Sequence, residues 1–222
     1  MKKYALLVAG GVGRRMKSPT PKQFLIIGTK PVIIHTIEAF LGYDSGIEII
    51  LVLPQDHVGE WQRLAETYHL SESVKTCVGG GTRFQSVQAG LELVAPDSLV
   101  AIHDGVRPLI ARKVIEEGYT VARKKGSAIA SVPLRESIRK VGEQGSEALD
   151  RSQYRLIQTP QTFTSDLIKK AYSQRELAVF TDCASVAEYT GHEVTLIDSD
   201  YTNLKITGPE DIPLAEALLA MK

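Results

Sequence analysis

Short apolar runs alternate along the chain with stretches in which apolar residues recur at helical spacing. Six of these runs are rich in β-forming residues and predict strands at residues 4–8, 47–53, 74–78, 99–102, 128–132 and 194–197. Residues 31–41 open with a proline and residues 82–94 with a threonine, and both stretches have the pattern of amphipathic helices. This alternation predicts an α/β fold: a mostly parallel central sheet, flanked by helices, that binds ligands at the carboxyl ends of its strands.

One region interrupts the alternation. Residues 132–141 and 148–158 are predicted to be two extended segments, joined by a turn at residues 142–145. This β-excursion, at about residues 133–157, is a candidate dimerisation arm. The 222 residues contain no internal repeat or linker and suffice for one sizeable core, so we expect a single domain over residues 1–222 that includes the arm.

Composition excludes several classes of protein. Lys+Arg and Asp+Glu are balanced at 26 each, so no overall positive charge favours nucleic acid or an anionic membrane. The amino-terminal segment lacks the long apolar stretch of a signal peptide, and no apolar run reaches membrane-spanning length. Cys77 and Cys183 lie far apart without metal-ligand spacing, which predicts two unpaired thiols in a cytoplasmic protein, with no disulfide and no zinc site.

A glycine-rich loop follows the first predicted strand directly. Its backbone N–H groups are placed to cradle a phosphate at the edge of the sheet. Met16 stands where a dinucleotide-binding fingerprint needs glycine, and the Gly-Lys-Ser/Thr of a Walker A loop is absent. The loop therefore predicts a nucleotide site of another type, formed by Ala9, Gly10, Gly11 and Gly13.

Two cations, Arg15 and Lys22, follow this loop, and Pro21 precedes the second of them. They are candidates to flank a triphosphate and to offset the charge that develops at an attacked α-phosphate. Considered alone, the loop is interpreted equally well as a structural glycine-rich turn whose cations are solvated. Its order, Gly-x-Gly-Arg-Arg-Met at residues 11–16 and Pro-Lys-Gln-Phe at residues 21–24, resembles the nucleotide-binding signature of the 2-C-methyl-D-erythritol 4-phosphate cytidylyltransferase family of the non-mevalonate isoprenoid pathway.

A second segment is similar to the same family: Asp-Arg at residues 150–151, followed by Gln-Thr-Pro-Gln-Thr-Phe at residues 158–163. The resemblance implies a Rossmann-like nucleotidyltransferase fold and the transfer of CMP from CTP to 2-C-methyl-D-erythritol 4-phosphate. The products would be 4-diphosphocytidyl-2-C-methyl-D-erythritol and pyrophosphate. The resemblance also implies Mg²⁺ as cofactor, held mainly by the CTP phosphates with Asp104 as the candidate protein ligand, and a homodimer whose arms complete the neighbour's site.

The resemblance assigns roles to further residues. The predicted nucleotide-binding residues beyond the first loop are Gly80, Gly81, Arg83, Ser86, Asp104 and Gly105. The first four of these would favour cytosine over uracil. The predicted substrate-binding residues are Asp104, Arg107, Ser137, Arg151, Thr159 and Lys205.

Four cations form the predicted catalytic set: Arg15, Lys22, Arg151 and Lys205. By the resemblance, Arg151 and Thr159 reach across the dimer to the substrate phosphate. Lys205 is predicted on a short apolar strand, from which it would orient the attacking phosphate.

Some of these residues also have purely structural interpretations. Asp104 and Arg107 can pair to brace the turn between them, and a single Arg151 is usually a solvated loop cation. His103, at a strand end, is interpreted as a packed residue rather than a general base, because an anionic phosphate nucleophile has little need for one. Cys183 occupies a position that is commonly acidic in relatives and is assigned no chemistry.

Two other functions remain open. Ribitol 5-phosphate cytidylyltransferases resemble this chain in the glycine-rich loop and in the His-Asp-x-x-Arg-Pro segment at residues 103–108, although they depart from it around Asp150 and Arg151. The other alternative is a catalytically silent nucleotide-binding regulatory module. Such a module would be expected to lack one of the four catalytic cations, all of which are present.

Overall fold

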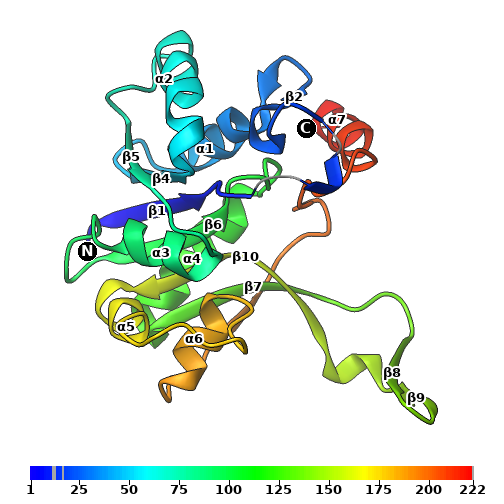
Figure 1. Ribbon diagram of the computed structural model, residues 1–222. Coiled ribbons are helices and arrows are strands. Elements are labelled where there is room, and N and C mark those ends of the chain that lie inside the picture. Colours follow the sequence, from blue (N-terminus) through cyan, green and yellow to red (C-terminus); the bar gives the residue numbers. More distant parts are fainter. Residues whose placement is uncertain (12–13, 17, 222) are drawn as a thin grey trace.

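The computed structural model describes residues 1–11, 14–16 and 18–221. Within these residues a seven-stranded sheet forms the centre of the molecule, in the order β11-β7-β10-β6-β1-β4-β5 (Figure 1). In chain order its strands are β1 Lys3–Val8, β4 Glu48–Leu53, β5 Val74–Val78, β6 Leu99–Asp104, β7 Ser127–Pro133, β10 Arg155–Thr164 and β11 Leu196–Asp198. Neighbouring strands are parallel except at β10, which is antiparallel to both β6 and β7.

Helices cover both faces of this sheet. One face carries α1 (Val32–Tyr43), α2 (Val58–Thr67) and α4 (Arg112–Lys125), and the other carries α3 (Arg83–Leu91), α5 (Ser165–Ala171) and α6 (Cys183–Tyr189). The alternation of side chains along β1 explains this arrangement, because Ala5 and Leu7 are buried in the first apolar cluster and Leu6 in the second. A third cluster joins α7 (Asp211–Ala220) to the β2–β3 hairpin (Ile26–Ile27 and Lys30–Pro31).

The apolar pattern located six of the seven strands of the central sheet and two of the helices. All six predicted strands are confirmed within two residues of their predicted bounds, and the two predicted helices are confirmed as α1 and α3. Thr82 caps α3 as predicted, because its hydroxyl accepts a hydrogen bond from the backbone N–H of Gln85 at 3.1 Å. The mostly parallel α/β sheet is confirmed as well. In the described part of the chain, no helix combines the length and the apolar character that crossing a membrane requires.

Strand β10 is the element of the sheet that the pattern missed. It is rich in Gln and Thr instead of apolar β-branched residues. It also contains Pro160, which has no N–H to donate, and its pairing with β7 shifts register between Ile157 and Gln161. The strand predicted around Lys205 is wrong, because residues 203–207 form an irregular segment between β11 and α7.

The predicted β-excursion is present as a hairpin of β8 (Ile138–Gly142) and β9 (Gly145–Leu149), which projects from the body of the molecule beyond β7 and β10 (Figure 1). Its second segment was predicted to run unbroken over residues 148–158, which is wrong. A 3₁₀ helix, Arg151–Gln153, separates β9 from β10. The side chains of both hairpin strands are mostly exposed.

The packing of α3 on the sheet generates a test of stability. An alanine Cβ at Gly90 would lie 2.7 Å from Leu6 Cδ1 and 2.9 Å from Val52 Cγ2, both in the core. We expect Gly90→Ala to lower the free energy of unfolding by about 1–3 kcal/mol through overpacking. Gly42 is likewise the penultimate residue of its helix but has open space around it. Gly42→Ala is therefore expected to stabilise by about 0.5–1 kcal/mol. Denaturant unfolding followed by circular dichroism checks both, and equal effects of the two substitutions would contradict the packing argument.

Candidate active site

A cavity of about 340 Å³ lies where β1 and β6 end. Ten of the predicted site residues line it: Ala9, Gly10, Gly11, Lys22, Gly80, Gly81, Arg83, Ser86, Asp104 and Lys205. A second cavity of about 260 Å³ shares Arg83, Asp104 and Lys205 with the first and adds Arg107 and Thr159. The carboxyl edge of the sheet therefore holds two adjoining cavities with a common charged boundary, where the alternation of strands and helices predicted a ligand site.

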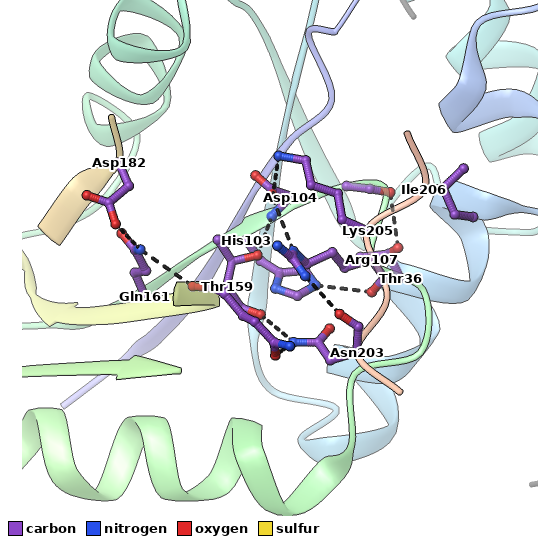
Figure 2. Close-up of polar contacts among 12 residues, drawn as sticks. Thr36, His103, Asp104, Arg107, Thr159, Gln161, Asp182, Asn203, Lys205 and Ile206 are labelled. Atoms are coloured by element: carbon purple, nitrogen blue, oxygen red, sulfur yellow. Dashed lines mark hydrogen bonds and ion pairs between the residues drawn. The ribbon is translucent and has the colours of Figure 1, made fainter. Parts of the chain in front are cut away.

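The Asp104 carboxylate is the centre of this boundary (Figure 2). Its Oδ2 accepts hydrogen bonds from Lys205 Nζ at 3.0 Å and Arg107 Nε at 3.2 Å, and its Oδ1 lies 3.8 Å from Arg83 Nε. Burial alone would raise the pKa of Asp104. The charges of Lys205, Arg83 and Arg107 outweigh burial and lower that pKa well below its usual value. The side chain is therefore a carboxylate at neutral pH, and it holds three cations together.

Lys22 brings another cation to the first cavity from a buried position. Its Nζ donates to the carbonyl of Ile206 at 3.1 Å, and an alanine Cβ at Gly11 would lie only 3.5 Å from its Cε. Burial, then repulsion by Lys205 and Arg15, lowers the pKa of the Lys22 ammonium, and attraction by Asp104 only partly offsets these effects. A polyphosphate in the cavity would relieve this repulsion, so the charge distribution suits an anionic ligand.

Arg15 is exposed in the short 3₁₀ helix Arg14–Met16, and its charge acts on Lys22. Of the two predicted cations, Lys22 lines the first cavity and Arg15 lines neither cavity. Gly13, predicted to bind the nucleotide, lies outside the described residues.

The loop before α3 forms the opposite wall of the first cavity. An alanine Cβ at Gly80 would lie 2.3 Å from Gln85 Cβ, so the chain needs glycine there. The Gly81 N–H donates to Gln85 Oε1 at 2.9 Å, and the buried Ser86 hydroxyl donates to the carbonyl of Thr82 at 2.8 Å. Backbone and side-chain polar groups are therefore gathered at this wall by the first turn of the helix.

Gly105 lines neither cavity, and its nucleotide-binding role stays a prediction. Its N–H donates to the carbonyl of Val8 at 2.9 Å, and its own carbonyl accepts from the Thr36 hydroxyl at 3.1 Å. A Cβ at this position would lie 2.9 Å from Ile33 Cδ1. Gly105 therefore allows the end of β6 to pack closely against α1.

Thr159 lines the second cavity of its own chain. Its side chain is buried, and Thr159 Oγ1 accepts a hydrogen bond from the backbone N–H of Asp104 at 3.0 Å (Figure 2). Its contact with a substrate phosphate across a dimer stays a prediction. The central strand β10 thus places Thr159 directly beside the backbone of Asp104. The hydroxyl fixes the backbone from which Asp104 projects.

The buried Asn203 is a site residue that sequence reasoning missed. Its Nδ2 donates to Gln158 Oε1 at 2.9 Å and to the carbonyl of Thr159 at 2.8 Å, and its own carbonyl accepts from Arg107 Nη1 at 2.8 Å (Figure 2). These bonds tie the irregular segment that carries Lys205 to β10. The sequence feature that could have revealed this contact is a pair of amide side chains, Gln158 and Asn203. Each lies at the edge of a segment that was considered for another residue, Thr159 or Lys205.

His103 is a packed residue, as interpreted from the sequence. It is fully buried, its Nε2 lies 3.2 Å from the carbonyl of Arg107, and its ring packs edge-on against Phe40. Burial lowers its pKa to about 4, so the ring is neutral near neutral pH.

Arg151 and Ser137 are not brought to either cavity of their own chain. Both are exposed on the projecting arm, where the Arg151 guanidinium donates to the carbonyl of Arg135. The sulfur atoms of Cys77 and Cys183 are unpaired, in agreement with the predicted free thiols.

Comparison with known proteins gives one consistent family. The profile of the 2-C-methyl-D-erythritol 4-phosphate cytidylyltransferase family matches residues 4–221. The protein of that name from Phocaeicola vulgatus is 45% identical over 219 residues, which cover 99% of this chain and 100% of that protein. Its namesake from Halalkalibacterium halodurans is 37% identical over 223 residues, covering 99% of this chain and 98% of that protein.

Solved structures agree with these matches. The 4-diphosphocytidyl-2C-methyl-D-erythritol synthase of Anaerococcus prevotii has a TM-score of 0.85 at 28% identity and covers 99% of this chain and 96% of that chain. The 2-C-methyl-D-erythritol 4-phosphate cytidylyltransferase of Thermus thermophilus has a TM-score of 0.78 at 27% identity and covers 99% of this chain and 100% of that chain. The Rossmann-like nucleotidyltransferase fold is therefore shared along the full length.

The lowered pKa of Asp104 predicts a pH-dependent contribution to stability. A depressed carboxyl pKa stabilises the fold above the unfolded pKa of about 4, and this contribution is lost as the pH falls through the folded pKa. We expect Asp104→Asn to lower the free energy of unfolding by about 3 kcal/mol at neutral pH, because buried cations lose their partner. The difference from the native chain should shrink below about pH 4.

Denaturant unfolding at a series of pH values measures this difference. Glu72→Gln, at an exposed carboxylate, is the control and should change stability little. A loss from Asp104→Asn that stays constant across the acid range would refute the electrostatic account.

Proposed function

The chain belongs to the 2-C-methyl-D-erythritol 4-phosphate cytidylyltransferase family, and on this premise we propose that it transfers CMP from CTP to 2-C-methyl-D-erythritol 4-phosphate. The products are 4-diphosphocytidyl-2-C-methyl-D-erythritol and pyrophosphate. The observation that carries this proposal is the charged boundary of Arg83, Asp104 and Lys205 between two adjoining cavities. One cavity has the glycine-rich wall and buried cation of a triphosphate site, and the other is lined by Arg107 and Thr159.

The reaction needs alignment of two anions more than proton transfer. An oxygen of the substrate phosphate attacks the α-phosphorus of CTP and forms a new P–O bond. The bond from that phosphorus to its bridging oxygen breaks, and pyrophosphate leaves with the electron pair. The attacking phosphate is already anionic, so no general base is required, in keeping with the packed and neutral His103.

Each cation has a place in this scheme. Lys22 and Arg15, on the glycine-rich side, neutralise the charge that develops on the α-phosphate and on pyrophosphate. Lys205 and Arg107, held by Asp104, orient the attacking phosphate from the second cavity. Arg83 stands between the two groups, beside the wall that would receive the cytosine base.

The site is suited to Mg²⁺ that is bound together with CTP. Asp104 is the one carboxylate on the described wall of the first cavity, and its Oδ1 is held only by Arg83 at 3.8 Å. A single carboxylate together with substrate phosphates is a usual environment for Mg²⁺. When bound, the ion would supply charge neutralisation on the triphosphate, with Asp104 Oδ1 as its protein contact.

The projecting arm supports a homodimer within the proposal. Arg151 and Ser137 have no contact with the cavities of their own chain, yet a planar guanidinium suits a phosphate ligand. We assign them to the substrate phosphate in the neighbouring subunit's site. The chain as a whole is proposed to be a single cytoplasmic domain that functions in this paired form.

Substrate choice is the first prediction of this proposal. Pyrophosphate release from CTP and Mg²⁺ is measured with 2-C-methyl-D-erythritol 4-phosphate and with ribitol 5-phosphate, each offered alone. We expect strong preference for the methylerythritol compound. Preference for ribitol 5-phosphate would assign the chain to the alternative cytidylyltransferase, and turnover of neither would leave the regulatory module as its function.

A mixing experiment tests the cations and the arm together. Lys22→Ala is expected to lower kcat by about 10²-fold with a smaller effect on substrate binding, because its charge acts mainly in the transition state. Arg151→Ala should also lose most activity. If the arm serves a neighbour, a dimer of one Lys22→Ala and one Arg151→Ala subunit contains one site with both cations intact.

Mixing the two variants under conditions of subunit exchange should therefore restore part of the activity. Lys140→Ala removes another exposed arm cation and is expected to stay active without mixing. Failure of the mixed variants to regain turnover, despite proven exchange, would place Arg151 in its own subunit's site or outside catalysis.

A further inference from the structure

Arg83 lies at the boundary of the two cavities, so the direction of its guanidinium affects both of them. It is the first residue of α3, directly after the glycine-rich wall, and it lines both cavities. Its Nε lies 3.8 Å from Asp104 Oδ1, its Nη1 donates to Cys183 Sγ at 3.2 Å, and its Nη2 is buried with no hydrogen-bond partner within the described residues. One edge of the guanidinium is thus held by the protein, while Nη2 has no hydrogen-bond partner in the described part of the chain.

The burial and backbone of α6 place the sulfur that holds Arg83. Cys183 is fully buried as the first residue of α6, and its backbone N–H donates to Gln161 Oε1 of β10 at 2.9 Å. Its Sγ also accepts a hydrogen bond from the Tyr172 hydroxyl at 3.2 Å. Burial raises the pKa of Tyr172, so this phenol stays protonated and donates. The Tyr172 ring stacks on Phe84, the residue after Arg83, with 4.6 Å between the ring centroids.

We propose that Cys183 is a positioning residue for nucleotide specificity, because its sulfur fixes the Arg83 guanidinium at the wall that receives the base. This inference rests on the proposed function, in which the site takes CTP. Cytosine presents an unprotonated N3 acceptor where uracil presents an N3–H donor. A guanidinium donor held toward that position favours cytosine, whereas a guanidinium free to swing away favours neither base.

The geometry explains why a thiol can serve here. Sulfur is a weak hydrogen-bond acceptor, but a charged donor strengthens the bond, and burial removes water as a competitor. Asp104 cannot hold Arg83 in place alone, because its other oxygen is already shared by Lys205 and Arg107 and its Oδ1 is 3.8 Å away. The second acceptor on Arg83, from α6, defines the direction of the guanidinium plane.

The test compares kcat/KM for CTP with kcat/KM for UTP in the full-length protein. Arg83→Ala is expected to lower this ratio by about tenfold or more, since a hydrogen bond to a charged group is lost. Cys183→Ala should lower the ratio in the same direction, and Cys183→Ser, which retains an acceptor, should keep it close to the native value. A merely structural role for Cys183 would lower both values of kcat/KM together and leave the ratio unchanged.

A double variant makes the link to Arg83 explicit. If Cys183 acts through the guanidinium, Arg83→Ala with Cys183→Ala should have the same ratio as Arg83→Ala alone. Tyr172→Phe is the matched control, because it removes the other donor to the same sulfur and keeps the ring stacked on Phe84. It should retain the ratio. Thermal melting of each variant separates loss of fold from loss of selectivity.

An unchanged CTP-to-UTP ratio in Cys183→Ala, or effects of the two substitutions that simply add, would overturn the inference. An unchanged ratio in Arg83→Ala would overturn it too, since there would be no base-reading group to position. Should the native protein turn over neither polyol phosphate, the proposed function fails independently. Calorimetric binding of CTP and UTP to the same variants then decides the role of Cys183.

Discussion

The buried carboxylate of Asp104 is the interaction on which the site depends. Lys205, Arg107 and Arg83 come from three separate parts of the chain, and their positive charges would repel one another without a common anion. Asp104 is placed for this role by the last position of a fully buried central strand, and its backbone is held by the Thr159 hydroxyl of the neighbouring strand. The fold thus fixes the position of the Asp104 carboxylate, and the cations of the site are arranged around this group.

A cationic site held by one carboxylate suits a reaction between two anions. The two cavities share Arg83, Asp104 and Lys205, so in the proposed reaction one set of charges would border both reactants and reduce the repulsion between them. Lys22 extends the positive region under the glycine-rich loop, where burial and neighbouring cations lower its pKa. Positioning and electrostatics are then sufficient for catalysis, and a neutral, packed His103 is consistent with a reaction that transfers no proton.

The sequence predicted the parts of this structure that rest on apolar burial and on local capping. Strands such as β1 and β4 are mostly apolar after their first residues, Lys3 and Glu48, because both faces are covered, and Thr82 caps a helix through its own side chain. Strand β10 was missed because it is held by polar contacts: Gln158 and Gln161 use their side chains to bind distant segments. Polar contacts also explain why the segment of Lys205 was wrongly predicted as a strand. This segment is held in place by the side-chain hydrogen bonds of Asn203, which a pattern of apolar residues does not reveal.

Strand β10 connects the projecting arm to the site, although the two lie apart. The strand runs from Arg155 at the base of the arm to Thr159 beside Asp104, and four extended residues span about 13 Å. Arg151 lies further out, as the first residue of the 3₁₀ helix, and lines neither cavity of its own chain. In the proposed function, this guanidinium contacts the substrate phosphate in another molecule's site. Pairing of two chains would then bring each arm to the cations that Asp104 holds, and the rigid strand would set the position of both.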